Sequence, residues 1–426
     1  MRRFRWMPYR SICRRINMPD LSSIMSLAVC LACPAMFGPS ASPESPVVQD
    51  QATGARQVAS PADSWPGCPA PPLYRSDPRG YTVGLAIDIG ATSQTRGVPD
   101  PFLSLGGSIT IAAATVDTAT VSDLRGLETS IRLNGIPQNT SARVEGDPLS
   151  GSQRISLGIP RGPLQTVSAR VTWPAIAFSI GVDEQMAAKV TWPREWVPEV
   201  AKFLAPSQGI QSDNEIFKAF VAKTTEGRLR RTPIYLAAKD LVRRTIMEFR
   251  NVDSQTLVRE GQGTIRGFRL QGALSSTGAL SVTPGDMVCT CVAVLRAAGI
   301  PARPVIGIYS GSGSNPDTKL PKDRKTLCVW AEFNLPGCGW VPFDPYEMRG
   351  RGLPQANVNQ PWKWFGTIKQ MNRRVGLAYD FAPFNHGMIR DWPAGWVWTV
   401  SGQTTAPFRL VDATAPLMVS RGQIRP

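Results

Sequence analysis

The chain has 426 residues, too many for one small domain and suited to two or three. Hydrophobic residues make up 42% and charged residues 19%, so most of the chain can bury a core and little of it is expected to be disordered. The formal net charge of +15 favours anionic partners through long-range attraction. With 38 Pro and 38 Gly, short strands and turns are expected rather than a helical bundle.

Residues 1–41 have the pattern of an export signal peptide. Six Arg form a basic start, residues 24–37 are apolar, and small residues follow. The apolar run is shorter than the roughly 20 residues of a membrane-spanning helix, and Pro34 interrupts it. A retained anchor, or lipid attachment at Cys30 or Cys33, stays open as an alternative. We therefore expect an exported protein, periplasmic or at the cell surface, for which nucleic acid is not an expected partner.

The part of the chain after this leader keeps a formal net charge of about +10, because six Arg and one Asp lie in residues 1–41. That charge makes an anionic cell-wall polymer one possible partner. An odd number of cysteines follows the leader, so at least one thiol is free or paired between chains. These cysteines are Cys68, Cys289, Cys291, Cys328 and Cys338.

Residues 42–76 are rich in Pro, Ser and Ala and are expected to form a linker. From 77 to 193 the pattern changes to short β-branched segments bounded by turn residues, which is typical of a β-sandwich. The Asn134-Gly135 pair marks a hairpin turn. The clearest predicted strands are Tyr81–Ile89, Ser108–Ala114 and Val167–Trp173.

After residue 194 the apolar residues recur at helical spacing. Three helices are expected, one near 197–204, one starting at Asp213, and one starting at Pro233. A fourth helix should begin at Thr283 and end at Gly299, because Thr caps, Pro284 suits the first turn and Gly allows a left-handed stop.

The fourth helix has apolar residues on most of its surface, so it should be buried against the strands that follow it. Those strands are expected at 303–309, 327–335 and 339–343. A buried helix packed on an antiparallel sheet gives an α+β class for residues 194–426. Tryptophans near 392–398 are expected to complete the sheet of this same domain.

Three linked pieces of this region are distinctive in order and spacing. They are Arg296 to Arg303 with Gly-Ile-Pro-Ala-Arg, Trp330 to Glu332, and Gly339 to Pro345 with Gly-Trp and Asp-Pro. They resemble the transglutaminase-like family, whose papain-like cysteine-enzyme core often follows a β-sandwich domain. The resemblance implies that core here, and a nucleophilic Cys at the first turn of the buried helix, a His on the next strand and an Asp on the strand after it.

An ungapped alignment places the family's nucleophile at Pro284 and its His at Cys328, while the Asp is kept as Asp344. The single His of the chain, His386, is far downstream and fits a turn. The resemblance therefore predicts the fold and a degenerate active site. Asp344 also fits the start of an ordinary Asp-Pro turn.

An active cysteine amidohydrolase or transamidase remains the alternative, with Cys289 as nucleophile and Asp344 as its partner. Cys289 lies one to two turns inside the predicted helix, where the dipole has faded, and no His is at hand to accept its proton. The simpler interpretation is that Cys289 and Cys291 are core residues.

Cys289, Cys291 and Cys328 could approach one another if the helix packs on the strand. A Cys-x-Cys pair on a helix points in divergent directions, which suits a metal badly, so no metal or cofactor is expected. A disulfide from Cys328 to Cys289 or Cys291 stays open. Arg303 is expected to act near the helix end, and Trp330 and Trp340 to pack in the core. The loop at 310–325 ends in four basic residues and could form a basic rim.

These observations favour an exported transglutaminase-like protein that binds an envelope peptide or protein, or acts as a scaffold, without catalysis. A purely structural envelope protein cannot be separated from this interpretation by sequence.

Overall fold

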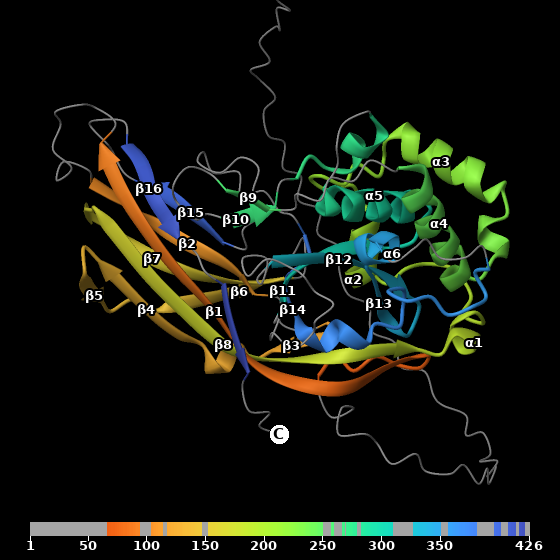
Figure 1. Ribbon diagram of the computed structural model, residues 1–426, viewed down its shortest axis with the longest axis horizontal. Helices are drawn as coiled ribbons and strands as arrows, with labels where there is room; N and C mark the ends of the chain where they lie inside the picture. The colour runs from red at the N-terminus through yellow and green to blue at the C-terminus, as the bar shows by residue number, and fades with distance from the viewer. Residues whose placement is uncertain are drawn as a thin grey trace, which may run out of the picture. The chain divides into compact units, whose positions relative to one another are not determined.

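The computed structural model describes residues 66–93, 104–113, 117–146, 152–249, 257–259, 266–268, 270–278, 283–309, 327–350, 357–380, 396–401, 408–414 and 417–421 (Figure 1). The α-helices are α1 (Glu184–Ala187), α2 (Pro198–Ala201), α3 (Glu215–Thr225), α4 (Ile234–Glu248), α5 (Pro284–Ala297) and α6 (Pro345–Gly350). The 3₁₀ turns are η3 (Leu124–Gly126), η4 (Lys202–Leu204), η5 (Leu229–Arg231), η6 (Ala273–Thr277) and η8 (Lys369–Arg373).

The strands of the first half are β1 (Leu73–Ser93), β2 (Ser104–Ala113), β3 (Thr120–Ser122), β4 (Glu128–Leu133), β5 (Ile136–Gln138), β6 (Ala142–Gly146), β7 (Gln153–Pro163) and β8 (Thr166–Val182). The later strands are β9 (Leu257–Arg259), β10 (Arg266–Phe268), β11 (Ala302–Tyr309), β12 (Leu327–Leu335), β13 (Gly339–Phe343), β14 (Arg374–Ala378), β15 (Trp396–Ser401), β16 (Phe408–Thr414) and β17 (Leu417–Arg421).

Two antiparallel sheets form the predicted β-sandwich. One has the order β16-β1-β8-β4-β5, with β17 also on β1 and β3 also on β8, and the other has the order β15-β2-β7-β6. Alternate residues of both sheets, such as Val171 and Leu157, are fully buried in a shared core. The Asn134-Gly135 turn joins β4 to β5 with φ of 51° and 80°, as the hairpin prediction requires.

The structure corrects two expectations at the ends of this sandwich. β1 begins at Leu73, so the last residues of the expected 42–76 linker are strand. The tail strands do not complete the sheet of the second domain: β15 pairs with β2, and β16 and β17 pair with β1. A short alternation of apolar and polar residues predicts a strand but not its partner, because pairing depends on which sheet edges other parts of the chain leave available.

A third antiparallel sheet has the order β13-β12-β11-β14. Helix α5 packs on its strands β11 and β12 and is flanked by α3, α4 and α6 (Figure 1). Rings of Tyr235, Phe333, Phe343 and Phe365 pack together at centroid distances of 5.6–6.2 Å on the helical side of this sheet. Strand β14 packs against β2, β3 and β8, which joins the small sheet to the sandwich.

The helix starts follow from local sequence. Thr283 caps α5, Gly299 adopts the left-handed φ of 76° that ends it, and Pro233 precedes α4, as predicted. The cap of α3 is Asn214 rather than Asp213, one residue later than expected. Within the described residues, no helix has both the length and the apolar character needed to cross a membrane.

Candidate functional site

At the start of α5, a capping box and the loop before it are joined by hydrogen bonds to one carboxylate. Thr283 Oγ1 accepts from the backbone N–H of Asp286, and Oδ2 of Asp286 accepts from the backbone N–H of Thr283 at 2.9 Å. Oδ1 of Asp286 accepts from the backbone N–H groups of Gln271 and Gly272 at 2.7 and 2.8 Å. Asp286 is fully buried, so its carboxylate holds the helix start and the preceding loop together. Pro284 is buried at the first residue of the helix.

Cys289 and Cys291 are core residues, both with no exposed surface. Burial, and to a smaller extent the Asp286 carboxylate, raise the pKa of the Cys289 thiol well above its ordinary value. Burial also raises the pKa of Cys291. Both side chains are therefore neutral thiols at pH 7, whereas a cysteine nucleophile reacts as the thiolate.

Asp344 lies at the end of β13 with its carboxylate paired to Arg374. Oδ2 of Asp344 accepts from Nη1 of Arg374 at 2.6 Å, and Oδ1 accepts from the backbone N–H of Glu347 at 3.0 Å. The side chains of the pair are 3% and 7% exposed. The Arg374 guanidinium also lies over the rings of Trp330 and Trp364, at 5.8 and 5.2 Å from their centroids. Sequence reasoning missed Arg374, because the Arg373-Arg374 pair carries no motif.

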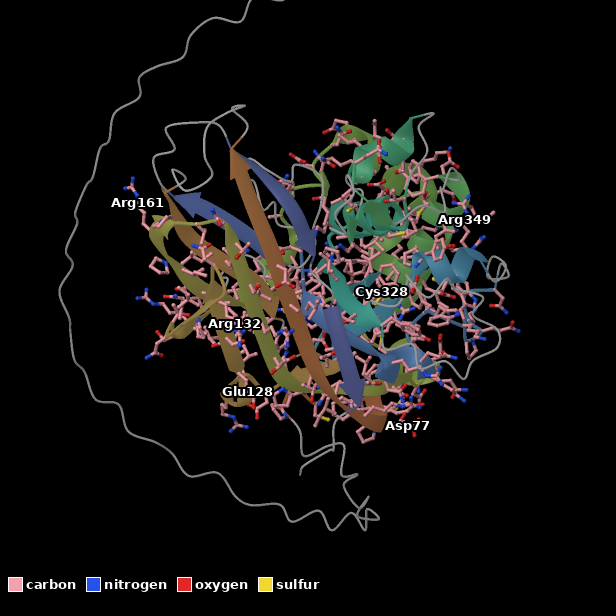
Figure 2. The ribbon with its side chains drawn as sticks, turned by 60° about the vertical axis from the view of Figure 1, so that its left-hand side comes forward. Asp77, Glu128, Arg132, Arg161, Cys328 and Arg349 are labelled. Carbon is pink, nitrogen blue, oxygen red and sulfur yellow. The ribbon has the colours of Figure 1, made fainter. Side chains whose placement is uncertain are left out.

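Cys328 stands on β12, opposite Gly307 of β11, and is partly exposed as a residue. Burial of its thiol raises the pKa to about 12; the charge of Asp344 adds to the rise and that of Arg374 opposes it. The structure therefore brings Cys328, Asp344 and Arg374 into one electrostatic neighbourhood (Figure 2 labels Cys328). At neutral pH it holds a protonated thiol and an Arg-Asp ion pair.

Cys289 lies in a different environment. The charged groups that act on its thiol are Asp286 and Arg296 of its own helix, whereas Asp344 acts on Cys328. A Cβ placed on Gly209 would lie 3.8 Å from the Cys289 sulfur, so this thiol packs against the loop that precedes α3. Cys289 and Asp344, the two residues of the alternative active-enzyme interpretation, thus have different charged neighbours.

Arg303 does not act at the helix end as expected. The Arg303 guanidinium pairs with Oε2 of Glu332 at 2.8–2.9 Å. Its Cζ atom also lies 4.0 Å from the ring centroid of Trp340 and 3.7 Å from that of Tyr379. Arg296 takes the helix-end role instead, donating to the backbone carbonyl of Ala302 at 2.8 Å. Arg303 pairs with Glu332 and not at the helix end because β11 places residue 303 directly opposite residue 332 on β12.

Asp117 approaches the Arg303–Glu332 pair from the sandwich. Its Oδ1 accepts from the backbone N–H groups of Ala119 and Thr120 at 2.5 and 2.6 Å, which fixes it in the turn before β3. Burial raises the pKa of Asp117, and burial together with the Asp117 charge raises the pKa of Glu332 to about 7. Two buried carboxyl groups therefore share the field of the Arg303 guanidinium at the junction of sandwich and small sheet, and Arg75 also acts on Asp117.

The remaining predicted residues have the following places. Trp330 is fully buried as predicted, and Trp340 is partly buried with its ring edge-on to Phe203 at 5.0 Å. In the described part of the chain, Cys289, Cys291, Cys328 and Cys338 form no disulfide. The described part of the chain has no group of three or more His, Cys, Asp or Glu arranged for a metal. His386, the loop at 310–325 and the leader lie outside the described residues.

Comparison with known proteins agrees with this architecture. Residues 281–345 match the family model described as Transglutaminase-like superfamily. The crystal structure of a candidate cysteine protease from Cytophaga hutchinsonii aligns with a TM-score of 0.50 and 14% identity, covering 83% of this chain and 95% of that one. The periplasmic domain of TgpA from Pseudomonas aeruginosa aligns with a TM-score of 0.28 and 14% identity, covering 65% and 93%. A search of curated proteins finds no match.

The family match covers α5, β11, β12 and β13, which carry the buried helix, the Arg303–Glu332 pair and Asp344. The likeness to the Cytophaga structure extends the shared fold across most of the chain, while its low identity carries no information on activity. Residues 281–345, which form part of the α+β core, are thus similar to the transglutaminase-like superfamily.

Proposed function

We propose that this protein is a catalytically degenerate transglutaminase-like protein of the cell envelope, which binds an envelope peptide or protein or serves as a scaffold. The observation that carries the proposal is the ion pair between Asp344 and Arg374. In Cys-His chemistry the Asp orients an imidazole that accepts and returns a proton. In this protein the Asp344 carboxylate is paired with the Arg374 guanidinium, which stays protonated in proteins and transfers no proton.

The nucleophile position supports the same proposal. Pro284 has no nucleophilic atom, and it is buried in the first turn of α5. Cys289 and Cys291 are fully buried with raised pKa values, so less than about 1% of either thiol is ionised at pH 7. The active-enzyme alternative would require Cys289 to leave the core and to find a base other than Asp344.

The chemistry of the partner is proposed from the net charge of the chain and from its expected export. A formal net charge of about +10 outside the leader suits an acidic peptide, an acidic protein surface or an anionic wall polymer. Export follows from the leader pattern in residues 1–41 and is part of the proposal. Binding of this kind should weaken as salt rises, because the attraction between exposed charges is screened.

Thiol alkylation resolved by residue tests the proposal. The full chain is treated with iodoacetamide at pH 7, with and without denaturant, and each cysteine peptide is quantified by mass spectrometry. Cys68 is exposed and serves as the internal reference for an accessible thiol. We expect native labelling of Cys68, and labelling of Cys289 and Cys291 only after denaturation.

Rapid modification of Cys289 in the native protein, at a rate above that of Cys68, would overturn the degenerate assignment and support the active cysteine enzyme. A Cys289→Ser variant then decides whether amide hydrolysis or transamidation of Gln-containing peptides depends on that thiol. The purely structural alternative predicts slow thiols and also no salt-sensitive binding to acidic peptides or teichoic-type polyphosphate.

A further inference from the structure

Strand β6 is the outer strand of the sheet β15-β2-β7-β6, and its pairing partner is β7. Four of its five residues, from Arg143 to Gly146, are exposed. Val144 lies opposite the fully buried Ile155, so it belongs to the inner face of the sandwich, yet it is 43% exposed. An outer strand with free backbone N–H and C=O groups is a template for pairing with another strand.

The charge order along β6 is self-complementary. Arg143 and Glu145 flank Val144 and point to the same face of the strand, because they are two residues apart. When two copies of β6 run antiparallel about a two-fold axis at Val144, Arg143 of each copy lies opposite Glu145 of the other. Opposite charges in directly facing cross-strand positions stabilise a sheet, and like charges there destabilise it.

We propose that β6 is a homodimer interface, in which a second copy of this chain pairs antiparallel with β6 in the register that puts Val144 opposite Val144. The two four-stranded sheets then continue through the axis as one. Such an interface is isologous, since the same residues serve on both copies, and this is the commonest symmetry of soluble homo-oligomers. Two Arg143–Glu145 pairs set the register, and the two Val144 side chains cover each other.

The neighbouring edge explains why β6 rather than β5 takes the partner. β5 is the outer strand of the other sheet on the path through β4, and its middle residue is Pro137. Proline offers no backbone N–H, so it is placed at edges that do not add a strand. β6 has no proline, so each of its residues has a backbone N–H as well as a C=O group.

Disulfide trapping tests the register directly. In a full chain carrying Cys68→Ser, Val144→Cys should form a disulfide between copies under mild oxidation, identified by mass spectrometry of the linked peptide. Directly opposite residues in an antiparallel pair have Cα atoms about 4.5–5.5 Å apart, within the range of a disulfide. The matched control is Gly146→Cys, because a Cβ there has open space around it. In this register the two copies of residue 146 are about 13 Å apart along the strand and should not cross-link.

Charge exchange tests the pairing without a cross-link. Arg143→Glu and Glu145→Arg each place like charges opposite one another, and each should raise the dissociation constant about tenfold or more. A mixture of the two variants restores opposite charges at both positions and should associate as hetero-pairs. The double variant Arg143→Glu/Glu145→Arg should associate like the parent. Analytical ultracentrifugation of the two single variants, their mixture, the double variant and the parent gives these constants.

The proposal fails if the parent chain sediments as a monomer up to its solubility limit. It also fails if Gly146→Cys cross-links as well as Val144→Cys, or if the single charge variants associate like the parent. Arg143 and Glu145 are exposed, but Glu145 also faces Arg154 of β7 in its own chain, so the thermal unfolding profile of each variant must show that it folds. None of the outcomes depends on whether the transglutaminase-like core is catalytic.

Discussion

Arg374 donates to the carboxylate of Asp344 at 2.6 Å, with both side chains almost entirely removed from solvent. Asp344 is the one residue of the family's catalytic set that the ungapped alignment retains, and in this protein it neutralises the guanidinium of a residue on β14, at the opposite edge of the same sheet. Cys328, which the ungapped alignment places at the family's His position, lies close enough to Asp344 and Arg374 for its pKa to respond to both charges. Asp344 and Arg374 therefore form a buried ion pair beside a protonated thiol.

Breaking the Asp344–Arg374 pair by removing one partner should strongly destabilise the protein. Replacing Arg374 by Met leaves a buried, unpaired carboxylate, so the free energy of unfolding should fall by about 3–5 kcal/mol. Urea denaturation of the parent and the variant measures this. The Lys218–Glu215 pair is the control: it is exposed, and Lys218→Met should change the unfolding midpoint little.

A double-mutant cycle separates the pair from general packing damage. Asp344→Asn removes the charge that Arg374 compensates, so the combined variant should lose much less than the sum of the single losses. Strict additivity would show that the two side chains do not interact and would remove the main support for the proposed function.

Stability should fall as pH rises from about 5 to 8. Glu332 has a folded-state pKa raised from 4.5 to about 7, so the native state holds a proton that the unfolded chain has already released. The resulting contribution is present below the unfolded pKa and is lost as pH rises through the folded one. Asp117, raised by the same burial, adds in the same direction. The loss should be on the order of 1–3 kcal/mol.

Glu332→Gln provides the control for that pH dependence. The amide cannot ionise, so the variant's unfolding free energy should change less between pH 5 and 8 than that of the parent. An equally steep profile in the variant would assign the pH dependence to other groups. Hydrogen exchange at Ala119 and Thr120, whose N–H groups bind Asp117, reports whether the junction loosens.

Asp286 should prove structural and not catalytic. Asp286→Ala removes the acceptor of four hydrogen bonds at the start of α5, so the loss should exceed the roughly 1 kcal/mol of an ordinary helix cap. The comparison is Asn214→Ala, which removes the exposed single-bond cap of α3. Equal losses in thermal unfolding would show that the hydrogen bonds from Gln271 and Gly272 to Asp286 add nothing to an ordinary helix cap.

Gly307 should not tolerate a methyl group. A Cβ at this residue would lie 2.5 Å from the Trp330 ring and 2.6 Å from the carbonyl oxygen of Val375. Gly307→Ala should therefore destabilise by about 1–3 kcal/mol through overpacking. Gly158→Ala, on β7 with open space around its Cβ, is the matched substitution and should be nearly neutral in the same unfolding assay. A neutral Gly307→Ala would mean that Trp330 moves freely and does not fix the Arg374 environment.

The local sequence determined the elements at the centre of this protein. Thr283, Pro284, Asp286 and Gly299 specify the beginning and the end of α5, because caps, proline and left-handed glycine act within one turn of the chain. The spacing of Arg303, Glu332 and Asp344 indicated a transglutaminase-like core, and an ungapped alignment over the same stretch predicts Pro284 and Cys328 at the nucleophile and His positions.

The tertiary structure alone decided which of these residues meet. Arg374 joins Asp344 through pairing of β11 with β14 and β12, and Asp117 reaches Glu332 from 215 positions away in the chain. Likewise, β16 pairs with β1 and β15 pairs with β2, although these strands are far apart in the sequence. A strand's own pattern specifies which face is buried, but its partner and the charges brought against that face depend on contacts between distant segments, which no local pattern encodes.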